Sequence, residues 1–169
     1  MKKKIITITG ESGTGKTEMV KYILNKYNIP MIESYTDRPK RTPDEIGHTF
    51  LTPQEYDEIK LEDMIAHTTF GGNRYCCVKD DVKDINTYVI DEKGIKYLYT
   101  NFGDAYDIIT IRLLRDETKR REIVGDKRVD RDKGQFNISL ALYDYVINND
   151  ESLNIFYQNI DKTIKDIMR

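Results

Sequence analysis

The sequence has little cysteine, and this excludes two classes of stabilised fold. Only two of its 169 residues are cysteines, and these are the neighbours Cys76 and Cys77. Adjacent cysteines suit neither a disulfide framework nor a four-ligand metal site. We therefore expect both side chains to be reduced thiols.

Long apolar runs and an excess of one charge are also missing. No segment approaches the roughly 18 to 20 apolar residues of a membrane helix, and residues 1–4 lead directly into a strand-like segment. Lys and Arg number 27 against 29 Asp and Glu, a formal net charge of −2, which argues against a coat for nucleic acid or an anionic membrane. We expect a cytoplasmic protein whose partners are neither nucleic acid nor membrane.

The length and the 38% hydrophobic content suit a single domain with one core. Strand patterns at 4–9, 87–91, 106–112 and 145–147 alternate with helical patterns at 19–24, at 94–101 and from about 151. This order predicts a parallel α/β sheet. Residues 34–84 differ, with short strand-like pieces and too few large apolar residues for a core of their own. We expect them to form a small subdomain at one edge of the sheet.

The first strand ends in a glycine-rich motif. Residues 10–17, GESGTGKT, satisfy G-x-x-x-x-G-K-[ST] and stand between a strand and a helix. Such a loop turns its backbone N–H groups around a polyphosphate. The residues predicted to bind the phosphates of the nucleotide are Gly10, Ser12, Gly13, Thr14, Gly15, Lys16 and Thr17. Lys16 would bridge the β- and γ-phosphates of ATP, and the Thr17 hydroxyl would be a ligand to Mg²⁺.

This loop alone does not separate kinases from other users of nucleotides. A GTPase should also carry an Asn-Lys-x-Asp motif, and the chain has none. Arg38 and Arg41 offer a second clue, since Pro39 and Pro43 hold their segment extended. Two guanidinium groups can converge on one phosphate. A second phosphate site opposite the first is what a phosphoryl-transfer enzyme needs.

Taken together with further segments of the chain, these motifs resemble those of the guanylate kinase family. The likeness lies in Ser34-x-Thr-x-Arg38-Pro-x-Arg41 with Glu45, Gly47 and Phe50, in 70–75 (FGGNRY), in 89–94 (VIDEKG) and in 143–150 (YDYVINND). It spans nearly the whole chain in the right order. The resemblance implies a P-loop α/β three-layer sandwich with a central parallel sheet, made of a core (1–33, 85–114 and 137–169), a monophosphate-binding subdomain (34–84) and a lid (about 115–136).

The resemblance also implies roles for single residues. Ser34, Arg38, Arg41 and Tyr75 would hold the phosphate of the acceptor. Asp91 would reach the acceptor nucleoside or a magnesium-bound water, or cap the following helix. Asn149 would lie near adenine or serve as a turn residue.

The lid segment is rich in basic residues. Arg128 and Arg131 share a helix face by spacing and would close over the phosphates as catalytic groups. Asp126, Asp130 and Asp132 lie among these arginines, so a salt-bridged surface helix is the alternative.

Three positions depart from the family pattern around the base of the acceptor. His48 stands where the family usually has tyrosine, Ala66 where it has a guanine-reading glutamate, and Cys76-Cys77 where it has Gly-Ser. His67 or Thr69 could replace the glutamate if the register differs. His48 could still contact substrate.

The resulting prediction is an enzyme that transfers the γ-phosphate of ATP, with Mg²⁺, to GMP or a related monophosphate. The alternatives are a kinase of another phosphorylated small molecule, such as a ribose bisphosphate, and a non-catalytic binding module. The sequence leaves the oligomeric state open.

Overall fold

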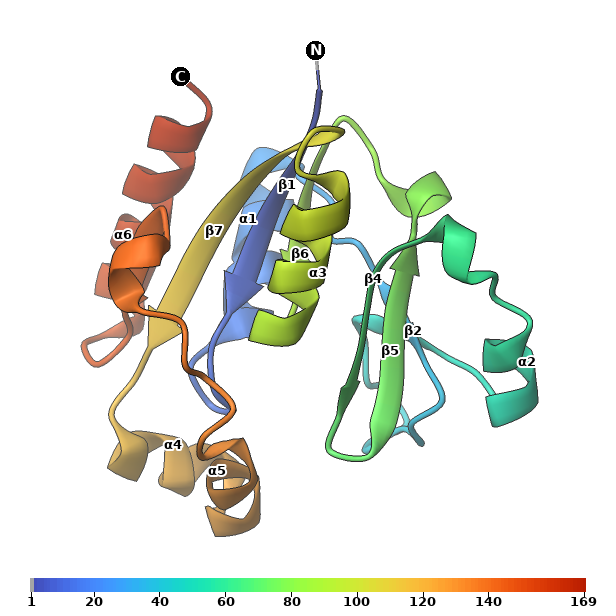
Figure 1. Cartoon of the computed structure of the whole chain (residues 1–169). Coiled ribbons are helices and arrows are strands. Elements are labelled where there is room, and N and C mark those ends of the chain that lie inside the picture. The colour runs from blue at the N-terminus through green and yellow to red at the C-terminus, as the bar shows by residue number, and fades with distance from the viewer. Residues whose placement is uncertain (1) are drawn as a thin grey trace.

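The computed structural model describes residues 2–169 and contains two four-stranded sheets (Figure 1). The main sheet has the order β6-β1-β7-β8, and every pair in it is parallel. Its strands are β1 (Lys3–Thr9), β6 (Ile85–Val89), β7 (Tyr106–Leu114) and β8 (Tyr145–Asn148). The predicted parallel α/β sheet is therefore confirmed. Because parallel strands end at one edge, the loops after β1, β6 and β8 meet there.

Helices cover both faces of this sheet, because the central strand β1 is apolar on both sides. Ile6 and Ile8 pack into one core with α1 (Lys16–Tyr27) and α6 (Leu153–Ile167). Ile5 points to the other face, where a second core includes Ile95 and Leu98 of α3 (Glu92–Phe102). Figure 1 shows α3 in front of the sheet and α1 behind it.

The strand predicted at 87–91 is shifted in the structure. β6 ends at Val89, and Asp91 instead caps α3, accepting a hydrogen bond from the Gly94 N–H at 2.8 Å. An aspartate at this position satisfies a backbone donor that the helix leaves unpaired, and so it ends the strand.

Residues 34–78 build the second sheet, of order β3-β2-β5-β4. Its strands are β2 (Ser34–Thr36), β3 (His48–Phe50), β4 (Met64–Phe70) and β5 (Asn73–Val78), with the short α2 (Pro53–Asp57) beside them. Ile65, Ala66 and Cys77 of this sheet belong to the same core as α3. The separate hydrophobic cluster within residues 34–78 has only three buried members, Tyr56, Met64 and Cys76. The subdomain therefore depends on the main body for most of its burial.

The basic segment after β7 forms two short helices, α4 (Glu117–Val124) and α5 (Asp126–Asp132). In Figure 1 both lie below the ends of β1 and β7. Among residues 2–169, no helix combines the length and apolar character needed to cross a membrane.

Candidate functional site

The glycine loop connects β1 to α1 and adopts a conformation that side chains would obstruct. Gly13 and Gly15 have φ of 85° and 104°. A Cβ on Gly13 would lie 3.2 Å from the backbone of Arg120, and one on Gly15 would lie 2.6 Å from Nδ2 of Asn149. The motif glycines therefore admit both a left-handed backbone and close neighbours.

Lys16 opens α1 with its ammonium group turned back over the loop. Its Nζ donates to the carbonyl oxygens of Gly10 at 2.6 Å and Glu11 at 3.0 Å. Burial lowers the pKa of Lys16 to about 8, against the opposing influence of Asp132. The amine is thus still mostly protonated at neutral pH and can serve as a cation for a phosphate.

The predicted acceptor arginines have different surroundings. Arg38 is buried, pairs with Glu45 at 2.7 Å, and donates from Nε to the Tyr75 hydroxyl at 3.1 Å. Arg41 is half-exposed, and its Nη1 lies 3.7 Å from Glu45. The pKa of Glu45 falls to about 2 despite burial, because Arg38 and the Arg41 backbone both donate to it. Glu45 thus organises the loop, and Arg41 is the more available cation.

Ser34 and His48 lie side by side on β2 and β3. Their Oγ and Nδ1 atoms are 2.7 Å apart, and the two residues are paired across the strands. Burial, with Arg38 and Arg41 nearby, lowers the pKa of His48 to about 4. The imidazole is therefore neutral at physiological pH and cannot hold a phosphate by charge.

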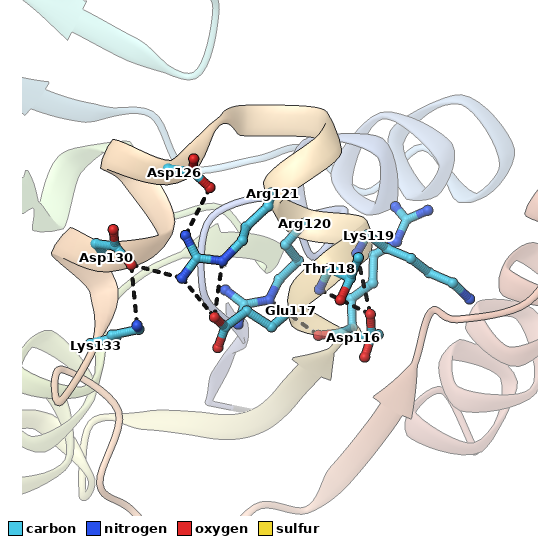
Figure 2. A network of polar contacts seen from close by, with 10 residues as sticks. Asp116, Glu117, Thr118, Lys119, Arg120, Arg121, Asp126, Asp130 and Lys133 are labelled. Carbon is cyan, nitrogen blue, oxygen red and sulfur yellow. Dashed lines mark hydrogen bonds and ion pairs between the residues drawn. The ribbon is translucent and has the colours of Figure 1, made fainter.

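The two helices of the predicted lid, α4 and α5, are tied together by Arg121. Its guanidinium pairs with Glu117 on α4 at 2.7 Å and with Asp126 and Asp130 on α5 at 2.9 and 2.7 Å (Figure 2). These ion pairs lie at the surface, so they add little to the stability of the fold and serve mainly to orient the two helices. They fix α5 relative to α4, which itself packs on the glycine loop through Arg120.

Two further arginines of α5 face inward. Arg131 donates from Nη2 to the Ser12 hydroxyl at 3.0 Å, and its guanidinium lies 4.9 Å from the centre of the Phe70 ring. Burial lowers the pKa of Arg128, and the nearby Arg41 and Arg131 lower it further. The Nε of Arg128 is buried without a hydrogen-bond partner. Three guanidinium groups thus crowd one space, an arrangement that favours an anionic ligand.

The end of this space near β4 and β6 is less polar. Ala66 and Cys77 face each other across β4 and β5 and are buried. Tyr88 packs with them, and burial raises its pKa well above the usual range. Thr68 donates to the Asp91 carboxylate at 3.0 Å. His67 instead packs edge-on against Tyr97, with ring centres 4.3 Å apart, and Thr69 is exposed.

The two segments predicted to bind phosphate, the glycine loop and the arginine loop, line one cavity of about 170 Å³. Of the residues predicted from sequence, it is lined by Gly10, Ser12, Lys16, Ser34, Arg41, His48, Tyr75, Asp91, Arg128 and Arg131. The remaining lining residues are Thr68, Phe70, Tyr88, Val89, Ile90, Asp132 and Phe136.

Comparisons with known proteins agree with this architecture. No protein-family model matches the chain. A guanylate kinase of Prochlorococcus marinus (strain MED4) is 23% identical over 178 aligned positions, covering 99% of the chain and 96% of that protein. One of Neisseria gonorrhoeae is 25% identical, covering 89% and 82%. The crystal structure of a guanylate kinase from Anaplasma phagocytophilum superposes with a TM-score of 0.70 at 20% identity, covering 99% of the chain and 85% of that structure.

The chain is similar to guanylate kinases over nearly its whole length and shares their fold.

Some residues implied by the guanylate kinase resemblance lie outside the cavity lining. Arg38 does not line the cavity, and its guanidinium donates to Glu45, Tyr75 and the Pro39 carbonyl. Asn149 is buried under the loop, where its Nδ2 donates to the Thr14 carbonyl at 2.9 Å. These contacts suit positioning of the phosphate loops, and direct contact of either side chain with a nucleotide stays a prediction.

Sequence reasoning missed Asp132, Thr68 and the aromatic wall of Phe70, Tyr88 and Phe136. In the sequence, Asp132 stands out only as one of several acids that lie among the lid arginines. Its position beside Arg131 was the single available signal. Thr68 lies between the two candidates considered for the missing glutamate, His67 and Thr69, and the strand register selects it.

The cavity offers two donors that suit the phosphates of a nucleoside triphosphate. The Arg128 Nε is a buried donor without a partner, and Lys16 supplies a half-buried cation. Among residues 2–169 no cluster of three or more His, Cys, Asp or Glu side chains is placed to hold a metal. The Thr17 side chain is exposed, and its role as a ligand to a Mg²⁺ ion bound with the polyphosphate stays a prediction.

Proposed function

We propose that this chain is an ATP-dependent nucleoside monophosphate kinase that transfers the γ-phosphate of ATP to GMP or a related ribo- or deoxyribonucleoside monophosphate. The observation that carries this proposal is the shared cavity, lined by Lys16 from the donor loop and Arg41 from the acceptor loop. The kinship with guanylate kinases supports the same assignment.

On the donor side, the backbone amides of the glycine loop and Lys16 bind the polyphosphate. The amides are oriented by Gly13, Gly15 and the Asn149 contact, so the backbone of the loop already has the curvature that an anion requires. Mg²⁺ bound through Thr17 would neutralise charge on the β- and γ-phosphates.

On the acceptor side, Arg41 and Ser34 orient the monophosphate, and Glu45 fixes the arginine loop. Arg128 and Arg131 approach from the lid and stabilise the charge on the transferred group. No general base is required, because the attacking monophosphate is already anionic. Phe70 and Phe136 line the same cavity and help to exclude water, which would otherwise compete as the acceptor.

Another phosphorylated small molecule is the second candidate for the acceptor. Neither Ala66 nor Cys77 lines the cavity, and Ala66 offers no carboxylate to bind a base, so a compound such as a ribose bisphosphate could use the phosphate clamp without a base.

An acceptor panel tests both assignments. The purified chain would be incubated with ATP, Mg²⁺ and, in turn, GMP, dGMP, AMP, CMP, UMP, dTMP and ribose 1,5-bisphosphate. ³¹P NMR would then show whether the acceptor gains a phosphate and ATP becomes ADP. The proposal expects a diphosphate product from at least one monophosphate and none with Lys16→Ala. A product from the sugar phosphate alone would favour the second candidate, and no product with any acceptor would favour a non-catalytic module.

A further inference from the structure

A carboxylate of the lid segment, Asp132, makes a hydrogen bond with the glycine loop. Asp132 ends α5 and is 3% exposed, and its Oδ2 accepts a hydrogen bond from the Ser12 N–H at 2.5 Å. Burial alone would raise its pKa, but the hydrogen bonds from Ser12 and Arg131 outweigh this and lower it. Asp132 is therefore an anion at neutral pH, bound to a backbone amide of the anion-binding loop.

The same carboxylate holds Arg131. Nε and Nη2 of Arg131 donate to Oδ1 of Asp132 at 2.9 and 2.7 Å. Nη2 also donates to the Ser12 hydroxyl at 3.0 Å. Ser12, Arg131 and Asp132 thus close a triangle of hydrogen bonds between the lid and the loop, although residues 12 and 132 are 120 positions apart.

Arg131 extends this triangle to the acceptor subdomain. Its guanidinium lies over the Phe70 ring, and its Cδ would lie 3.5 Å from a Cβ placed on Gly71 at the tip of the β4–β5 hairpin. The lid, the glycine loop and the acceptor subdomain meet at this one side chain. Whatever sets the orientation of Arg131 sets its position relative to both phosphate sites.

Carboxylates and phosphates use the same donors, namely backbone N–H groups, Lys and Arg. The Asp132 carboxylate is bonded to two of these donors and lowers the local charge beside Lys16. A polyphosphate that takes the Ser12 amide must displace it.

We propose that Asp132 is a positioning residue that couples the lid to donor binding. It holds Arg131 at the loop and yields the Ser12 amide to the polyphosphate of the donor. The coupling rests on the proposed kinase function, but the exchange of carboxylate for phosphate is a property of the loop alone. Asp132 consequently opposes binding of the donor and promotes the step that follows it.

The variant Asp132→Asn separates these two effects. Asparagine keeps the size of the side chain and can still accept from the Ser12 amide, but it removes the charge that competes with phosphate and that holds Arg131. The matched control is Asp130→Asn on the same helix, because Asp130 is exposed and contacts Arg121 and Lys133 instead of the loop. The probe is inorganic pyrophosphate without metal, measured by isothermal titration calorimetry.

We expect Asp132→Asn to bind pyrophosphate roughly tenfold more tightly than the wild type, since one charge-assisted competitor has been removed. Asp130→Asn should bind it as the wild type does. In the kinase assay, Asp132→Asn should show a lower KM for ATP together with a lower kcat. A folded Asp132→Asn with unchanged or weaker pyrophosphate binding would overturn the proposal, because a merely structural aspartate predicts that result.

A second measurement on the wild type covers the case in which Asp132→Asn does not fold. The amide resonance of Ser12 should be protected from hydrogen exchange in the free protein and should shift when pyrophosphate is added. The proposal would be overturned if the Ser12 amide exchanges freely in the free protein, or if its resonance does not shift when pyrophosphate is added. Neither measurement requires catalysis. If the acceptor panel yields no product while these tests succeed, the kinase function fails and the exchange at the loop stands.

Discussion

The hydroxyl of Thr68 donates a hydrogen bond to the carboxylate of Asp91 at 3.0 Å, and both side chains line the acceptor end of the cavity. Asp91 also caps α3 through its other oxygen, so the pair is held from two elements. Ala66, where the family has a guanine-reading carboxylate, is buried beside Cys77 and Tyr88. The polar contacts near the base therefore differ from the family pattern.

Selectivity for GMP should consequently be weak. Without a carboxylate at position 66, GMP should share its kcat/KM range with other monophosphates in the acceptor panel. Thr68→Val should lower kcat/KM for the preferred acceptor by about tenfold, because a buried polar partner is removed.

Thr69→Val is the control for this prediction, since Thr69 is adjacent but exposed. A strong preference of the wild type for GMP over dGMP, AMP, CMP and UMP would contradict the interpretation of Ala66. Equal effects of the two valine variants would remove Thr68 from the site.

Arg41 and Arg38 should respond differently to substitution. Arg41→Met should chiefly raise KM for the acceptor by about tenfold or more, because one charge-assisted contact to its phosphate is lost. Arg38→Met should also lower the stability of the fold, because it leaves Glu45 without its main partner. Steady-state kinetics at saturating ATP and urea unfolding measure the two effects. A wild-type acceptor KM in Arg41→Met would exclude Arg41 from the acceptor site.

Asn149 offers a choice between adenine contact and support of the loop. The Asn149 amide donates to the Thr14 carbonyl and lies against Gly15. Asn149→Ala should therefore lower the affinities for pyrophosphate and for ATP by similar factors. Calorimetry with the two ligands distinguishes the roles. Weaker binding of ATP with unchanged binding of pyrophosphate would show that Asn149 contacts the nucleoside instead.

His48 should make the fold less stable in mild acid. Its pKa is about 4 in the folded chain and about 6.5 in the unfolded chain. Between these values the unfolded chain binds the additional proton, so the free energy of unfolding falls as the pH falls below about 6.5. Between pH 6.5 and 5 the loss is at most about 2 kcal/mol.

Urea unfolding at pH 7 and pH 5 would measure this loss. His48→Asn should lose less stability than the wild type over that interval, and His67→Asn controls for removal of a histidine. An equal loss in the wild type and His48→Asn would contradict the assignment.

The sequence predicted the parallel sheet and the position of the glycine loop because both are local. Alternating β-branched residues specify β1, and the loop motif reports on the strand before it and the helix after it. Positions of side chains set by distant partners were less accessible. Nothing near Asp132 in the sequence indicates that it meets Ser12.

Strand register explains why the base end of the site was not predicted. The register of β4 shifts between Met64 and Ala66, and a shift of one residue exchanges the two faces of a strand. Whether Thr68 or one of its neighbours lines the cavity is therefore decided by how β4 pairs with β5. Composition and spacing within β4 carry no information on this pairing.

A dinucleoside oligophosphate, in which adenosine and the preferred acceptor nucleoside share one phosphate chain, tests the central claim most directly. If the glycine loop and the arginine loop serve one transfer reaction, this compound should compete with ATP and with the monophosphate alike. Its affinity should fall in both Lys16→Ala and Arg41→Met. Competition with only one substrate, or loss of affinity in only one of the two variants, would contradict a single cavity that binds donor and acceptor together.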